Sequence, residues 1–201
     1  MRLVLKIAAV SLLAPTFAWA TPPQCKQDTL TQYIALGAQG CELAGVVYAN
    51  FTYQGSSTGG APVIQSGEIE VTPSIAVPST GNFTFAAPWG ANGGQSQTSK
   101  ITYSAAIANG QTSSDALSLA LGPVQIGALG SATVTEKTNV GTLQVFENCG
   151  EVVCQRKGND SLQFSNALVV LVNEEVDVVG TEGFTALKSY EASLNSCVPC
   201  V

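Results

Sequence analysis

Residues 100–107 read KITYSAAI, and their side chains alternate between polar and apolar types. In an extended strand, successive side chains point to opposite faces. One face would therefore carry Ile101, Tyr103, Ala105 and Ile107, and the other Lys100, Thr102 and Ser104. This alternation predicts a strand of an antiparallel sheet with one buried face and one wet face.

The same period of two recurs in short runs along most of the chain. These runs cover residues 46–53, 68–72, 82–85, 117–121, 132–135, 143–145, 162–164, 168–172, 176–178 and 184–186. In the first run, the pattern places Val47, Ala49, Phe51 and Tyr53 on one face and Val46, Tyr48, Asn50 and Thr52 on the other. Clusters of Gly, Asn, Ser and Pro separate the runs, and the polar, Gly-rich stretches 55–61 and 90–98 are expected to be exposed loops. The pattern predicts a mostly β fold, an antiparallel two-sheet β-sandwich.

One short helix is expected near the N-terminus of this sandwich. Asp28 or Thr29 can cap a helix that continues to Leu36, and Gly37 is a stop signal. Leu30, Tyr33 and Ile34 share one face of it. No other helix is expected in the mature chain.

Residues 1–20 have the three zones of a secretory signal peptide. Arg2 and Lys6 supply positive charge, residues 7–14 are apolar, and Ala18-Trp19-Ala20 is a small-x-small cleavage site. A buried N-terminal helix is the alternative, which Pro15 disfavours. We expect cleavage after Ala20, a single β-sandwich domain over residues 21–201, and secretion to the extracellular space or the periplasm. No later stretch has the length of a membrane span.

The composition excludes several classes of function. The chain has no His, which removes the Ser-His and Cys-His nucleophile pairs and the usual zinc ligands. Its formal net charge is −6, and loss of Arg2 and Lys6 would make it more negative. Such a chain repels nucleic acid. We expect no cofactor, and extracellular polysaccharide or matrix proteins as partners.

Six cysteines after a signal peptide indicate disulfides, with fifteen possible complete pairings. Cys25 and Cys41 bracket the predicted helix, and Cys149 and Cys154 enclose four residues that would form a hairpin loop. Cys197 and Cys200 remain as the third pair. Two alternatives stay open: redox chemistry at Cys197 and Cys200, and a zinc site formed by the last four cysteines.

Two further groups of residues have both a functional and a structural interpretation. Glu174, Glu175 and Asp177 suggest a calcium site or a glycosidase pair, but Glu175 and Asp177 alternate on a strand and would form its wet face. Trp89, in a Pro-Trp-Gly turn, would stack on a sugar ring or, as we favour, pack in a partly buried loop on the sandwich edge.

An ordered set of motifs resembles a family of exported bacterial proteins of the PEP-CTERM-associated type, whose function is unknown. The first motifs are Thr29-Leu30-x-x-Tyr33-x-x-Leu36-Gly37-x-x-Gly40-Cys41 and Tyr48-x-x-Phe51-x-Tyr53. The later ones are Gly81-Asn82-Phe83-Thr84-Phe85, Ile101-x-Tyr103, Asp115-Ala116-Leu117-x-Leu119, Ala132-Thr133-Val134-Thr135-Glu136, Leu143-x-Val145 and Glu175-Val176-x-Val178. The sequence ends at Cys197-Val198-Pro199-Cys200-Val201 without the family's sorting tail, so tail-dependent surface sorting is not expected. The resemblance implies export and assigns no catalytic residue.

Three functions are compatible with these features. The first is a secreted, non-catalytic extracellular, cell-surface or matrix protein, which the signal peptide, the absent His and the resemblance favour. The second is a carbohydrate-binding module. The third is a secreted hydrolase, which would require two carboxyl groups facing each other in a cleft.

Overall fold

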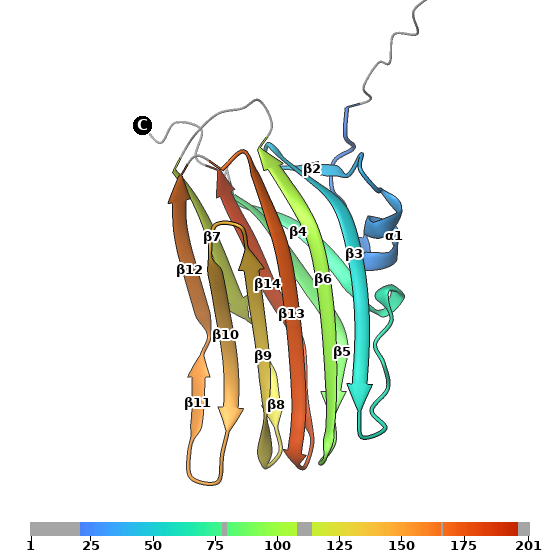
Figure 1. Ribbon diagram of the computed structural model, residues 1–201, viewed down its shortest axis with the longest axis vertical. Coiled ribbons are helices and arrows are strands. Elements are labelled where there is room, and N and C mark those ends of the chain that lie inside the picture. Colours follow the sequence, from blue (N-terminus) through green and yellow to red (C-terminus); the bar gives the residue numbers. More distant parts are fainter. Residues whose placement is uncertain (1–20, 78–79, 108–113, 166, 197–201) are drawn as a thin grey trace, which may run out of the picture.

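Two antiparallel sheets pack face to face in the computed structural model, which describes residues 21–77, 80–107, 114–165 and 167–196 (Figure 1). In spatial order the first sheet contains β11 (Cys154–Lys157), β10 (Thr142–Cys149), β9 (Leu129–Thr138), β13 (Val169–Glu182), β6 (Gln95–Ile107), β3 (Val46–Thr58) and β2 (Cys41–Leu43). The second sheet contains β1 (Asp28–Thr29), β4 (Glu70–Val77), β5 (Thr80–Ala91), β14 (Thr185–Ser196), β7 (Ser114–Leu121) and β12 (Asn159–Ser165), with β8 (Val124–Ile126) paired to β14. The predicted antiparallel two-sheet β-sandwich with one short N-terminal helix is confirmed.

The inward faces of the two sheets form a continuous apolar core. Ile101, Tyr103, Ala105 and Ile107 of β6 are all buried, as the alternation in KITYSAAI predicts. The intervening Lys100 is exposed and Thr102 and Ser104 are half-buried. The sandwich therefore follows directly from the burial of one face of each strand.

The predicted faces of residues 46–53 are wrong in part, because β3 contains a bulge. Asn50 has a φ of 58°, and the pairing register with β6 shifts between Ala49 and Thr52. An extra residue reverses the side-chain alternation. Tyr48 before the bulge and Phe51 after it consequently both point into the core.

The two stretches predicted as exposed loops are largely strands that pair with each other. Gly55 lies opposite Ser99 and Thr58 lies opposite Ser96, so the two strands stay paired to the end of β3 and almost to the start of β6. Hydroxyl groups also meet across this pair, with 2.8 Å between Thr58 Oγ1 and Ser96 Oγ. Apolar alternation did not predict these strands, because they are polar and are stabilised by the backbone hydrogen-bond ladder rather than by apolar side chains.

The strands predicted near the C-terminus are shorter than the observed strands. The runs at 168–172 and 176–178 belong to one continuous strand, β13. The run at 184–186 begins β14, which continues to Ser196 and lies between β5 and β7 in the second sheet. In this strand Tyr190, Ala192 and Leu194 are buried.

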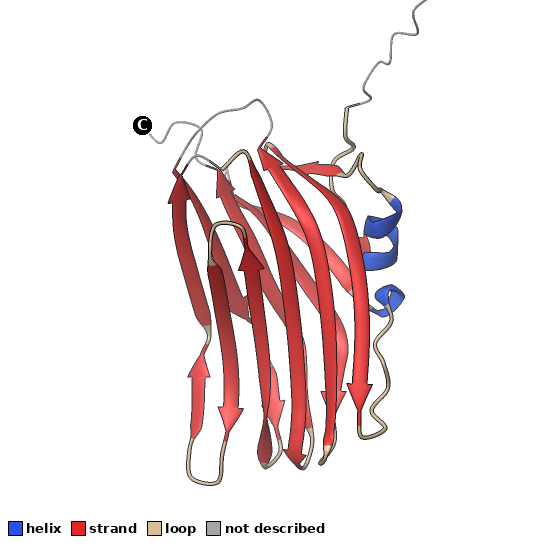
Figure 2. Cartoon of the chain, in the orientation of Figure 1, coloured by secondary structure: helices blue, strands red, loops and turns tan. Residues whose placement is uncertain are grey.

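The only α-helix of the described residues, α1 (Leu30–Ala35), covers an open side of the sandwich (Figure 2). Thr29 is its N-cap residue but forms no side-chain capping hydrogen bond, whereas Gly37 ends it with a φ of 56°. The Leu30 N–H donates to the Ile69 carbonyl at 2.8 Å. The Tyr33 ring packs edge-on against rings from both sheets, Phe51 of β3 and Phe83 of β5. A single 3-10 turn, η1 (Ser66–Glu68), lies close to the helix.

Within the part of the chain that the structure describes, no helix has the length and apolar character needed to cross a membrane.

Candidate functional site

Two disulfides stabilise the described part of the chain. Cys25–Cys41 joins residues with Cα atoms 4.9 Å apart, and Cys149–Cys154 joins residues with Cα atoms 4.0 Å apart. Both predicted pairings are confirmed. The zinc hypothesis is wrong for Cys149 and Cys154, because sulfur atoms bonded to each other cannot act as thiolate ligands. Cys197 and Cys200 lie outside the described residues.

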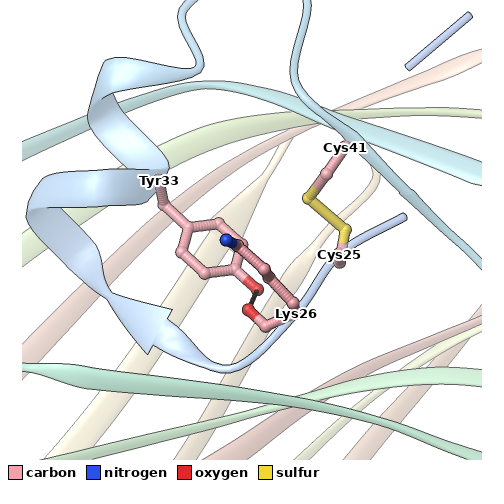
Figure 3. Close-up of a disulfide and its surroundings, with 4 residues drawn as sticks. All are labelled: Cys25, Lys26, Tyr33 and Cys41. Atoms are coloured by element: carbon pink, nitrogen blue, oxygen red, sulfur yellow. Dashed lines mark hydrogen bonds between the residues drawn. A yellow bond between two sulfur atoms is a disulfide. The ribbon is translucent and has the colours of Figure 1, made fainter. Parts of the chain in front are cut away.

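The Cys25–Cys41 disulfide borders the candidate site, a pocket of about 310 Å³ between α1 and the chain that precedes it (Figure 3). The preceding segment is fixed to β2 by two backbone hydrogen bonds. The Glu42 N–H donates to the Pro23 carbonyl at 2.8 Å, and the Cys25 N–H donates to the Glu42 carbonyl at 2.9 Å. The disulfide and this short ladder hold one wall of the pocket, and the helix forms the other.

Tyr33 fixes the inner part of the pocket. Its side chain comes from α1 and is buried, and its hydroxyl donates a 2.8 Å hydrogen bond to the Lys26 carbonyl (Figure 3). Burial, with a smaller contribution from the charge of Asp28, holds the pKa of the Tyr33 phenol far above its usual range. The hydroxyl therefore remains a donor and connects the helix to the opposite wall.

Several polar side chains also line this pocket. They are Gln24, Lys26, Asp28 and Gln32, and Leu36 adds an apolar contact. Lys26 Nζ lies 3.8 Å from Asp28 Oδ2, and the Lys26 side chain is 83% exposed. A partly exposed pair of this kind contributes little to stability, so Lys26 is free to meet a ligand, whereas Asp28 also accepts a hydrogen bond from the Thr29 N–H through Oδ1.

The composition of the pocket suits binding better than hydrolysis. Asp28 is the single carboxylate among the lining residues, and a carboxylate pair is required for the usual glycosidase chemistry. Two amides, one ammonium and one carboxylate provide both donors and acceptors, which matches the hydroxyl groups of a neutral polar ligand. The residues that line the pocket all lie between Pro23 and Cys41, but sequence analysis missed the site because the space between them depends on how the segment before the helix pairs with β2.

The acids considered from the sequence point in different directions. Glu175 and Asp177 lie away from the core, where Lys100 Nζ is 3.1 Å from Glu175 Oε2 and the Thr98 hydroxyl donates to Asp177 at 2.7 Å. Their predicted position on the wet face of the strand is confirmed. Glu174 points inward and is fully buried. Among the described residues, no group of three His, Cys, Asp or Glu is placed to hold a metal ion.

Glu174 faces a second buried acid that sequence analysis did not single out. Glu136 of β9 lies directly opposite Glu174 of β13 in the register, and both are enclosed between the sheets. The hydrolase hypothesis requires facing carboxyls in a cleft that a polysaccharide can enter, and this pair has no such access. The burial of Glu174 was predictable from the sequence, because Glu174 occupies the inward position between Val172 and Val176.

Trp89 lies on β5 rather than in a loop, and it is completely buried rather than partly exposed. Its indole N–H donates to the Ser99 hydroxyl at 3.0 Å, and its ring lies 5.8 Å from that of Tyr190. The prediction that Trp89 packs against the sandwich is thus confirmed, whereas its predicted position in a loop is wrong. A sugar ring cannot stack on a side chain in this position.

The fold and site define a disulfide-bonded antiparallel β-sandwich with a small pocket beside its helix, whose lining combines largely apolar surface with a few polar side chains. The chain matches no protein-family model and no curated protein. Among solved structures, it is similar to one described in work on the promiscuous specificity of carbohydrate-binding modules of the β-sandwich superfamily. The identity is 8%, the TM-score is 0.26, and the match covers 86% of this chain and 61% of the other chain. The match thus spans less than two thirds of that protein's length, and the likeness concerns the sandwich fold alone.

Proposed function

We propose that this chain is an exported, non-catalytic protein of the extracellular space, the cell surface or the extracellular matrix. The observation that carries the proposal is the pair of disulfides, Cys25–Cys41 and Cys149–Cys154. Such bonds form and persist in oxidising compartments. The three-zone leader over residues 1–20, the absence of His and the resemblance to exported proteins support the same conclusion.

Export with processing is tested on the full chain expressed with its own leader in a bacterium. N-terminal sequencing of the exported protein is expected to begin at Thr21, and non-reducing peptide mapping to recover both disulfides. The expectation rests on the cleavage site at residues 18–20. A product that retains Met1 and carries free thiols in the cytosol would overturn the proposal.

The pocket beside α1 supports a more specific activity, the binding of a neutral, hydroxyl-rich ligand such as an extracellular polysaccharide. Its volume of about 310 Å³ accommodates one or two sugar rings, in the lower range of small-molecule sites. Gln24 from the segment before the helix and Gln32 from α1 contribute amide groups to the lining, and Asp28 contributes a carboxylate. These groups can pair with adjacent sugar hydroxyls without any chemistry on the glycosidic bond.

Replacement of Gln32 by alanine is expected to weaken glycan binding about three- to tenfold, because one hydrogen bond contributes about 0.5–1.5 kcal/mol. The helix itself should tolerate the change, since alanine is the best helix former. The measurement is a glycan array with the mature protein, followed by calorimetric titration of the ligand it identifies. Gln163→Ala is the matched control, an exposed glutamine on β12 that does not line the pocket.

If the mature protein binds no glycan above background, the polysaccharide proposal fails while the proposal of export remains. Equal losses in Gln32→Ala and Gln163→Ala would place the ligand elsewhere on the molecule.

A further inference from the structure

Two carboxyl groups face each other inside the sandwich, away from every surface. Glu136 and Glu174 are directly opposed on the neighbouring strands β9 and β13, with 1% and 0% of their areas exposed. Each occupies the inward position of its strand, in line with Val134 and Val172. The apolar pattern of both strands is thus interrupted at the same level of the core.

Glu174 connects the two sheets through tyrosine hydroxyls. Its Oε1 accepts a 2.8 Å hydrogen bond from Tyr103 of β6 in the first sheet, and its Oε2 accepts one from Tyr190 of β14 in the second. Glu136 differs, because its Oε1 has no hydrogen-bond partner. The hydroxyl of Tyr48 on β3 is also without a partner, and Glu136 and Tyr48 both line a small void of about 10 Å³. A void of this size holds at most about one water molecule.

No positive charge compensates the pair within the described residues, whose ion pairs all involve other acids. The titratable groups that face it are the phenols of Tyr48, Tyr103 and Tyr190, and burial raises the pKa of each above its usual range. The second sheet lines the void with apolar side chains, among them Phe83 of β5 and Leu117 of β7, and with the uncharged Ser193 of β14. The surroundings therefore donate hydrogen bonds but supply no cation.

Such an environment opposes the loss of the last proton from the pair. Burial raises the pKa of Glu174 to about 7, although the hydrogen bonds from Tyr190 and Tyr103 lower it. Burial, and next the charge of Glu174, raise the pKa of Glu136 well above its usual range. Two negative charges in one desolvated site repel each other too strongly to coexist.

We propose that Glu136 and Glu174 keep a proton between them in the folded protein, so that the contact between the two sheets is a pH-sensitive device that loosens when the pair ionises. A shared or retained proton lets one carboxyl donate to its neighbour or to water in the void. This inference concerns the core and is independent of the ligand pocket and of export.

The direction of the pH dependence follows from proton linkage. A glutamate in the unfolded chain titrates near pH 4.3, while the pair in the folded chain titrates at higher pH. Between these values the folded state binds more protons than the unfolded state. Stability is thus greatest at mildly acidic pH and is lost as the pH rises through about 7. Each retained proton lowers the folding equilibrium constant about tenfold per pH unit in that window.

Urea unfolding of the mature protein at pH 5, 6, 7 and 8 tests this inference. The wild-type folding constant is expected to fall as the pH rises. Glu136→Gln cannot release a proton and keeps the side-chain shape, so its dependence on pH should be shallower by about tenfold in the constant per pH unit. It should also be more stable than the wild type at pH 8. The control is Glu182→Gln, an exposed acid at the end of β13 and outside the core, which should keep the wild-type slope.

The difference between variants decides the test, because burial also raises the pKa of Asp177 and adds to the wild-type slope. A Glu136→Gln protein with the full wild-type slope would overturn the inference, as would a wild type whose stability does not change with pH. If Glu136→Gln does not fold, carbon-13 NMR of the wild-type glutamate carboxyls decides. Two resonances should titrate well above pH 5, and titration of every glutamate near pH 4–5 would refute the shared proton.

Discussion

Replacing Trp89 with alanine is expected to lower the free energy of unfolding by about 3–5 kcal/mol, the usual cost of truncating a buried aromatic residue to alanine. The indole is 1% exposed and is among the largest fully buried side chains of the core. Its N–H donates to Ser99, so the side chain joins β5 of the second sheet to β6 of the first. The substitution removes a large apolar volume and an inter-sheet hydrogen bond at the same point.

The loss is large because a domain is typically stable by only about 5–15 kcal/mol. For a chain of this length the midpoint of thermal unfolding should fall by roughly 10 °C or more. Circular dichroism at 218 nm during heating measures it. Trp89→Phe retains much of the volume but not the N–H donor, and it should lose about half as much.

Phe184→Ala is the matched control, because Phe184 directly precedes β14 and its ring lies beside Gly90, next to Trp89 on β5, but the residue is 43% exposed. Its midpoint should change by only a few degrees. Similar midpoints for Trp89→Ala and Phe184→Ala would mean that the inter-sheet packing around Trp89 contributes far less than its burial indicates.

The Cys25→Ser, Cys41→Ser double variant is expected to lose about 3 kcal/mol of unfolding free energy. The bond closes a loop with a sequence separation of 16, and its removal restores that conformational freedom to the unfolded chain. Cys41 is also buried in the core, and the bond holds one wall of the pocket. The same variant should therefore lose ligand binding.

The Cys149→Ser, Cys154→Ser variant provides the comparison. Its loop has a sequence separation of 5, which corresponds to roughly 2 kcal/mol in the same model. The bond joins β10 to the edge strand β11, whose four side chains are all exposed. Opening of this hairpin leaves the core intact, so the measured loss should be smaller and glycan binding unchanged.

Thermal unfolding of both double variants, with peptide mapping under non-reducing conditions, tests this order of effects. An equal or larger loss for the Cys149–Cys154 pair would contradict it. So would a peptide that links Cys197 or Cys200 to Cys149 or Cys154.

The class of fold was predictable because it depends on local information. Alternation of side chains in runs such as 100–107 decides which face of a strand is buried, whatever strand lies beside it. The helix was predictable for the same reason, since its signals all lie between Asp28 and Gly37. Both disulfides close short loops, so sequence spacing alone brought their cysteines within reach.

Strand limits and bulges were not predictable in this way. Residues 55–58 and 96–99 are polar, and their strands are held by backbone pairing and by side-chain hydrogen bonds such as those of Ser96 and Ser99. The bulge at Asn50 reverses the inward and outward alternation of side chains within one run, and the residues on either side of it do not predict a positive φ. The second half of β14 has inward residues at Tyr190, Ala192 and Leu194. Its mixed composition did not predict a strand, although this strand lies in the middle of a sheet.

The sequence by itself determined the two-sheet architecture, the early helix and the two short-range disulfides, because these rest on periodicity and on contacts between residues close in the chain. Only the tertiary structure decided the positions of the ligand pocket and of the buried carboxyl pair. The pocket joins α1 to a segment held by β2, and the carboxyl pair joins Glu136 to Glu174 across 38 positions of the sequence. Such sites depend on which strands become neighbours, and that choice is made by the packing of the whole core rather than by any local pattern.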